Sequence, residues 1–177
     1  MLYFARHAES AANTGRIISN RDLPHPLTPT GRDQAQRLAE WLASEGIISI
    51  YSSPVPRAVE TARIISRVLD LPVEINEKLR EFDAGVLEGR SDPLTWMRFS
   101  SLWHVWFYRR KFDKRIRGGE SYREASRRFS DFVAQVAPSA AGVNDRVLCI
   151  THGGLLRIGL PGLLCNMDFE SIRDAPI

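Results

Sequence analysis

The sequence lacks long apolar runs, and this limits the kinds of protein it can encode. No stretch approaches the roughly 20 apolar residues that cross a bilayer. The short apolar run at the N-terminus has no basic segment before it, which argues against a secretory signal. We therefore expect a protein without a membrane partner.

Cysteine is also scarce. The 177 residues include only two, Cys149 and Cys165, and both lie in apolar runs. This pattern is typical of reduced thiols in a protein core rather than of a disulfide framework. We therefore expect a cytoplasmic protein.

Several ligand-binding patterns are missing as well. The chain has no phosphate-binding glycine loop of the P-loop type and no clustered residues with metal-ligand spacing. A bound phosphate would then have to be held by side chains. The formal net charge of +3 is too small to make the whole molecule a polyanion binder. No repeat, linker or low-complexity tract divides the chain, so we expect a single domain over residues 1–177.

The apolar segments that are present alternate between strand and helix patterns. Glycine- and proline-rich segments at residues 10–29 and 79–89 read as loops. The alternation predicts an α/β fold, a three-layer α-β-α sandwich with a mostly parallel central sheet. The expected strands cover residues 2–5, 47–51, 72–75 and 146–151, and the expected helices cover residues 31–44, 56–69, a segment with its apolar stripe from 125 to 136, and 153–164.

Residues 91–117 differ from the rest of the chain. Aromatic residues come first and a basic run from Arg109 to Arg117 follows. We interpret this segment as a helical cap insertion whose aromatic residues form its core and whose basic residues face solvent. A substrate with a second acidic group would give the basic run a function. Nothing in the segment resembles a nucleic-acid motif, so we expect no nucleic-acid partner.

Charged residues follow the expected strands at the point where each strand ends. Arg6 and His7 come directly after the first strand, His152 follows the last, and Arg57 opens a helix after the second. In open α/β sheets ligands bind at the carboxyl ends of the strands. Two guanidinium groups match phosphate oxygens, and a neutral imidazole can attack phosphorus. Nearby arginines should lower the pKa of His7 and keep it unprotonated near neutral pH.

Phosphoryl transfer also needs a proton for the leaving oxygen, and a carboxyl group with a raised pKa can supply it. Glu81, in the loop 79–89, is our candidate, with Asp83 and Glu88 as competitors. We expect Glu88 to support the loop instead. His25 and His104 are expected to be solvated or packed, although the loop that carries His25 could line the entrance of a site.

Five short motifs occur in order along the chain. They are Arg6-His7-Ala8 with Glu9 and Asn13, the run Ser52 to Ala62 that contains Arg57, Glu81 with Gly85, Glu88 and Gly89, the turn Gly118 to Ser121, and Thr151-His152-Gly153-Gly154. Through these motifs the whole chain resembles the histidine phosphatase superfamily, the phosphoglycerate mutase-like group. One departure is Ala8, where the family usually has glycine; alanine is harmless there unless the position needs a positive φ.

The resemblance assigns a role to each candidate residue. His7 would accept the phosphoryl group, and Glu81 would protonate the leaving oxygen and then activate water. No metal and no organic cofactor is implied. The residues expected to bind the phosphoryl group are Arg6, Arg57 and His152, with Asn13 assisting.

The function that we expect is a metal-independent phosphatase that hydrolyses phosphate monoesters of small metabolites through a phosphohistidine intermediate. A 2,3-bisphosphoglycerate-dependent phosphoglycerate mutase is the main alternative, because it shares the first half of the reaction. A non-catalytic module that binds phosphorylated ligands is a second alternative. The partner would be a small phosphorylated metabolite, and pairing of an edge strand leaves a homodimer open.

Overall fold

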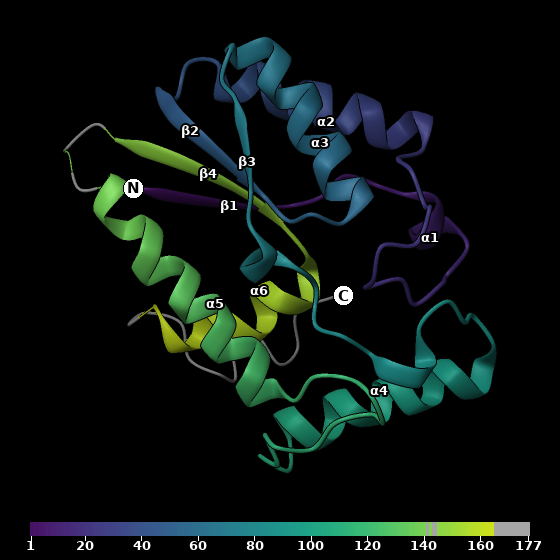
Figure 1. Ribbon diagram of the computed structural model, residues 1–177. Coiled ribbons are helices and arrows are strands. Elements are labelled where there is room, and N and C mark those ends of the chain that lie inside the picture. Colours follow the sequence, from purple (N-terminus) through teal and green to yellow (C-terminus); the bar gives the residue numbers. More distant parts are fainter. Residues whose placement is uncertain (141, 143–144, 165–177) are drawn as a thin grey trace.

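Four parallel strands form the sheet of the computed structural model, which describes residues 1–140, 142 and 145–164. The strands lie in the order β1-β4-β2-β3, so the last strand in sequence is central (Figure 1). Their bounds are β1 (Leu2–Arg6), β2 (Ile47–Ser52), β3 (Val73–Ile75) and β4 (Arg146–Thr151). Among the described residues, no helix has the length and apolar character of a membrane span.

Helices cover both faces of the sheet. In Figure 1, α2 (Pro29–Leu42) and α3 (Pro56–Leu69) lie on one face, and α5 (Tyr122–Val136) and α6 (Gly153–Gly159) lie on the other. The short α1 (Ala11–Thr14) and the longer α4 (Pro93–Phe107) lie beyond the carboxyl ends of the strands. Short 3-10 turns occupy Glu77–Leu79, Gly85–Leu87, Ala137–Ala140 and Leu160–Gly162. The predicted α/β sandwich with a parallel sheet is confirmed.

The central strand β4 is buried on both faces, which explains why residues 147–150 are all apolar. Val147 and Cys149 pack in one cluster with Phe129 of α5, whereas Leu148 and Ile150 pack in a second cluster with α2 and α3. Successive side chains of a strand point to opposite faces, so one unbroken apolar run supplies both cores. Cys149 is free and buried, as expected. Cys165 lies outside the described residues.

The structure differs from the predicted elements at three places. The predicted loop 10–29 contains the short helix α1. The last helix does not reach residue 164, because α6 ends at Gly159 and a 3-10 turn with Pro161 follows. Only the aromatic half of the insertion is helical: α4 ends at Phe107, and Arg110 has φ 54, a left-handed conformation that a continuing helix excludes. The insertion predicted at 91–117 thus contains a helix in its aromatic half, and its basic half lies outside that helix.

The strand order places a crevice at the ends of β1 and β4. After β1 the chain turns to the face covered by α2, and after β4 it turns to the opposite face through α6 (Figure 1). Because the two neighbouring strands send their chains in opposite directions, a gap opens between their carboxyl ends. His7 and His152 follow these two strands, so the fold itself brings the two imidazoles to one place.

The contact between α2 and the chain after β1 gives a test of this arrangement. A Cβ atom added at Gly31 would lie 2.0 Å from the Glu9 carbonyl oxygen, whereas one added at Gly162 would meet no atom of the described residues within 4 Å. We expect Gly31→Ala to lower the free energy of unfolding by about 1–3 kcal/mol, because the helix must move away. Gly162→Ala should change it by about 0.5 kcal/mol or less. Urea denaturation of both variants measures this, and equal stabilities would contradict the close approach.

Candidate active site

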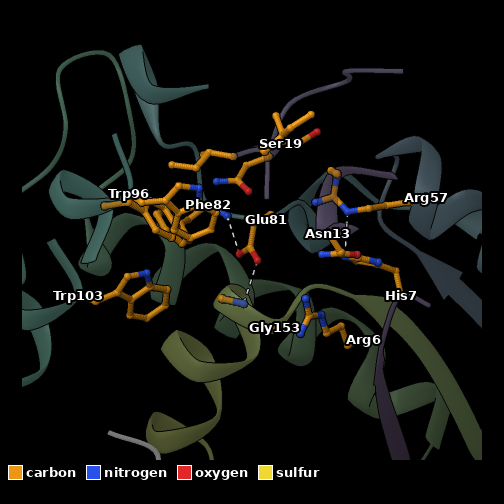
Figure 2. Close-up of a pocket in the computed structure, with 16 residues that line it drawn as sticks. Arg6, His7, Asn13, Ser19, Arg57, Glu81, Phe82, Trp96, Trp103 and Gly153 are labelled. Carbon is orange, nitrogen blue, oxygen red and sulfur yellow. Dashed lines mark hydrogen bonds between the residues drawn. The ribbon is translucent and has the colours of Figure 1, made fainter. Parts of the chain in front are cut away.

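A small cavity lies where the carboxyl ends of β1 and β4 meet α4 (Figure 2). Its volume is about 100 Å³. Its lining combines ionisable groups with aromatic rings, and most of these rings come from the cap. The first set is Arg6, His7, Arg57 and Glu81, and the second is Phe82, Trp96, Phe99 and Trp103.

His7 is buried and held by hydrogen bonds at both ring nitrogens. Nδ1 lies 2.8 Å from the carbonyl oxygen of Ala8 and therefore donates, while Nε2 accepts from Nε of Arg57 at 2.8 Å. This pattern fixes the neutral tautomer with a lone pair on Nε2. Burial, followed by the charge of Arg57, lowers the pKa of His7 to about 3. Ala8 is not among the described residues with positive φ, so alanine is tolerated there as expected.

Arg57 connects the two histidines. It is 5% exposed, and its Nη2 lies 3.2 Å from Nδ1 of His152. Burial lowers its pKa to about 10, which still leaves it a cation at neutral pH. Its Nη1 is buried and has no hydrogen-bond partner in the described part of the chain. A buried charged donor without a partner is costly, so the site favours an incoming anion that supplies an acceptor.

His152 is fully buried behind Arg57 and does not line the cavity. Its Nε2 lies 2.8 Å from the hydroxyl of Ser53, and its ring centroid is 5.1 Å from that of His7. Burial and the nearby Arg57 keep the pKa of His152 well below its ordinary value. Since neutral Nδ1 accepts from Arg57, Nε2 carries the proton and donates to Ser53. In this structure His152 thus orients Arg57 instead of facing the cavity directly.

Arg6 and Asn13 both line the cavity, as their predicted role requires. Arg6 is exposed and makes no hydrogen bond or ion pair to any described residue, so its guanidinium is free to meet an anion. Oδ1 of Asn13 accepts from the backbone N–H and the hydroxyl of Ser10, both at 2.9 Å. These bonds leave the amide NH₂ of Asn13 as its remaining donor, and Figure 2 shows this side chain beside Arg57 and His7.

Glu81 faces the cavity from the opposite side to His7 (Figure 2). Its two carboxyl oxygens accept from the backbone N–H groups of Phe82 at 3.0 Å and Gly154 at 2.8 Å. Desolvation nevertheless raises the pKa of Glu81 above its ordinary value. A Cβ added at Gly154 would lie 2.6 Å from Oε1, so a glycine at this position makes room for the carboxyl group.

The competing carboxyl groups lie elsewhere. Glu88 accepts from the backbone N–H groups of Asn20 and Ala84, at 2.7 and 2.9 Å, and thereby supports the loop as expected. Asp83 pairs with Arg21 at 3.0 Å and does not line the cavity. Of the three acidic residues in this loop, Glu81 alone borders the cavity.

The other two histidines do not reach the cavity either. His25 does not line it but is bonded to Ser19, a lining residue, with 2.9 Å between its Nδ1 and the serine hydroxyl. His104 is exposed and stacks on Tyr108 with a centroid distance of 4.8 Å. The basic residues from Arg109 to Arg117 also lie outside the cavity lining.

Sequence reasoning missed part of the wall. The segment from Ile17 to Asn20 lines the cavity. It belongs to the loop that carries His25, for which a place at the entrance was considered, but none of these four residues was named. Phe99 and Trp103 were expected to serve chiefly as cap core, yet they both pack in the core and line the cavity. The aromatic run of the insertion was the available signal for the second group. No group of three or more metal-ligand side chains is found among the described residues.

The two lowered histidine pKa values predict a pH dependence of stability. An unfolded histidine protonates near pH 6.5, whereas folded His7 stays neutral down to about pH 3, so stability is lost as the pH falls below 6.5. Between pH 7.5 and 5.0, His7 alone should account for a loss of about 2 kcal/mol. Urea denaturation of His7→Asn at the two pH values should show a correspondingly smaller loss than the wild type. Equal losses would contradict the buried neutral imidazole.

Comparison with known proteins identifies the family of the chain. The family model described as "Histidine phosphatase superfamily (branch 1)" matches residues 2–177. A "Probable phosphoglycerate mutase GpmB" of Salmonella paratyphi B is 35% identical over 153 residues, which are 86% of this chain and 69% of that protein.

Two solved structures are similar to this chain over almost its whole length. Bacillus stearothermophilus YhfR has a TM-score of 0.82 and 27% identity, over 99% of this chain and 84% of that one. A mycobacterial glucosyl-3-phosphoglycerate phosphatase, solved in complex with VO3, has a TM-score of 0.80 and 25% identity, over 96% of this chain and 84% of that one. Given the match of the family model over nearly the full length, this chain belongs to the histidine phosphatase superfamily, branch 1.

Proposed function

We propose that this protein is a phosphatase that hydrolyses phosphate monoesters of small metabolites through a phosphohistidine on His7. The observation that carries the proposal is the state of His7, whose Nε2 lone pair is held beside the cavity by Arg57. An unprotonated imidazole nitrogen can attack a bound phosphoryl group. The adjacent Arg57, whose Nη1 has no partner among the described residues, can bind the phosphoryl oxygens.

In the first step the phosphoryl oxygens take over the donors of Arg57, including the unpartnered Nη1. This exchange releases Nε2 of His7, which then forms a bond to phosphorus while the bond to the leaving oxygen breaks. The leaving oxygen receives the proton of the Glu81 carboxyl group, whose raised pKa allows it to be protonated more often than an exposed glutamate. Arg6 and Arg57 neutralise the charge on the three equatorial oxygens, and the amide NH₂ of Asn13 donates a hydrogen bond to them.

In the second step the Glu81 carboxylate removes a proton from water, and the water oxygen forms a bond to phosphorus. The bond from phosphorus to Nε2 breaks, which returns His7 to its neutral state and releases inorganic phosphate. The hydrogen bond from Nδ1 of His7 to Ala8 persists throughout and delocalises the positive charge of the phosphorylated ring. His152 acts by positioning Arg57.

The size of the cavity supports a small substrate. A volume of about 100 Å³ falls below the range typical of drug-sized ligands, so a short ester fits better than a peptide. The similar mycobacterial structure is a phosphatase of a glycosylated phosphoglycerate, which is also a small phosphorylated metabolite. A cytoplasmic location and a homodimer both stay predictions.

A phosphoglycerate mutase is the second candidate, and the 35% identity to a protein of that name is the observation in its favour. A mutase shares the first step but returns the phosphoryl group to a bound acceptor instead of to water. A non-catalytic binding module is disfavoured, because the nucleophile and the proton donor that the reaction needs, His7 and Glu81, both line the cavity.

The test is an assay of 3-phosphoglycerate with and without 2,3-bisphosphoglycerate, which measures phosphate release and isomerisation together. We expect phosphate release to be faster than isomerisation under both conditions. The substitution His7→Ala should lower the rate of phosphate release by at least about a thousandfold. Isomerisation that outruns phosphate release would favour the mutase. A chromogenic phosphate ester gives a second readout, and equal rates for wild type and His7→Ala on it would remove His7 from the mechanism.

A further inference from the structure

The cap supplies an aromatic wall to the cavity, and its tryptophans differ in one respect. Nε1 of Trp96 donates to the carbonyl oxygen of Arg16 at 2.6 Å, and Nε1 of Trp106 donates to that of Lys114 at 2.7 Å. Nε1 of Trp103 is buried and has no partner among the described residues. Trp103 is therefore the exception among the three tryptophans of the cap.

An unpartnered buried donor of this kind calls for an explanation, because a donor that has lost its water without gaining an acceptor destabilises the folded state. Trp103 is only 7% exposed, and it borders the catalytic cavity together with Glu81 and Phe82 (Figure 2). The guanidinium of Arg157 lies over its ring at 5.1 Å. A cation at the ring face draws electron density from the indole and makes its N–H a better donor.

A second residue that lines the cavity has a donor with the same property. Nδ2 of Asn20 is buried without a partner in the described part of the chain, although the backbone N–H of Asn20 is bonded to Glu88. Asn20 lines the cavity from the segment that follows α1. Two cavity-lining residues from distant parts of the sequence thus each carry a buried donor without a described partner.

We infer that Trp103 and Asn20 hold oxygen acceptors on the leaving group of the substrate. Resting on the proposed function, this inference assigns the substrate to esters of polyols or hydroxy acids, whose hydroxyl or carboxylate oxygens accept from Nε1 and Nδ2. The rings of Phe82 and Phe99 contact the C–H groups of the same leaving group. An ester with a plain alkyl leaving group leaves both donors unpaired and is a poorer substrate.

Three esters of the same carbon-chain length test the inference, scored by kcat/KM. Propyl phosphate has no extra acceptor, glycerol 3-phosphate adds hydroxyl groups, and 3-phosphoglycerate adds a hydroxyl and a carboxylate. We expect the wild type to prefer the oxygen-bearing esters. Trp103→Phe should lower kcat/KM about tenfold on them, mostly through KM, and about twofold or less on propyl phosphate.

Trp96→Phe is the matched control, because it makes the same chemical change on the same cavity wall at an N–H that already has a partner. It should change all three esters by one common factor. Asn20→Ala is a second variant that avoids repacking the cap, and it should show the same selective loss as Trp103→Phe. A loss on both oxygen-bearing esters identifies a hydroxyl as the acceptor, and a loss on 3-phosphoglycerate alone identifies the carboxylate.

Two results would count against the inference in different ways. If Trp103→Phe and Asn20→Ala change all three esters equally, the enzyme is a phosphatase but these donors do not read the leaving group. If the wild type releases phosphate from none of the three esters, the proposed function itself fails, and this inference fails with it.

Discussion

The hydrogen bond from Nε of Arg57 to Nε2 of His7 is the interaction on which the site depends. It fixes the imidazole tautomer and keeps the lone pair beside the cavity. Nη1 of the same guanidinium has no hydrogen-bond partner among the described residues. One side chain therefore holds the nucleophile at rest and is ready to accept the phosphoryl oxygens. An anion that pairs with Arg57 weakens this bond and frees Nε2 in the same event, so substrate binding and activation of the nucleophile are coupled.

The fold provides this arrangement through the order of its strands. Because β4 inserts between β1 and β2, residues about 145 positions apart in sequence, His7 and His152, lie with ring centroids 5.1 Å apart. Both rings are buried and neutral, and burial of this kind is maintained only if every ring nitrogen has a partner. Ala8, Arg57 and Ser53 supply those partners. Keeping two uncharged imidazoles beside a guanidinium therefore makes the folded protein less stable at low pH.

Much of this could be predicted from the sequence, because its strongest signals are local. The bounds of α3 follow from Pro56 and an apolar stripe, and they match the predicted helix 56–69. The strands are apolar runs that end on charged residues, so the neighbourhood of Arg6, His7 and His152 follows from the parallel topology.

What could not be predicted depends on tertiary contacts. The end of α4 at Phe107 depends on the left-handed Arg110, which no periodicity reveals. The inward position of residues 17–20 follows from contacts such as the Ile18 N–H to the Arg90 carbonyl oxygen. Nε1 of Trp96 reaches a backbone carbonyl oxygen, whereas Nε1 of Trp103 has no partner among the described residues. Because the two residues are identical and lie in one helix, the sequence does not reveal this difference.

The central claim is that a nitrogen of His7 carries the phosphoryl group. Rapid quenching of the wild type with a ³²P-labelled monoester, followed by peptide mapping, tests it most directly. The account predicts one label on His7 that is lost in acid, is stable in base and is absent from His7→Ala. A label on any other residue, or an equal amount of label on His7→Ala, would contradict it.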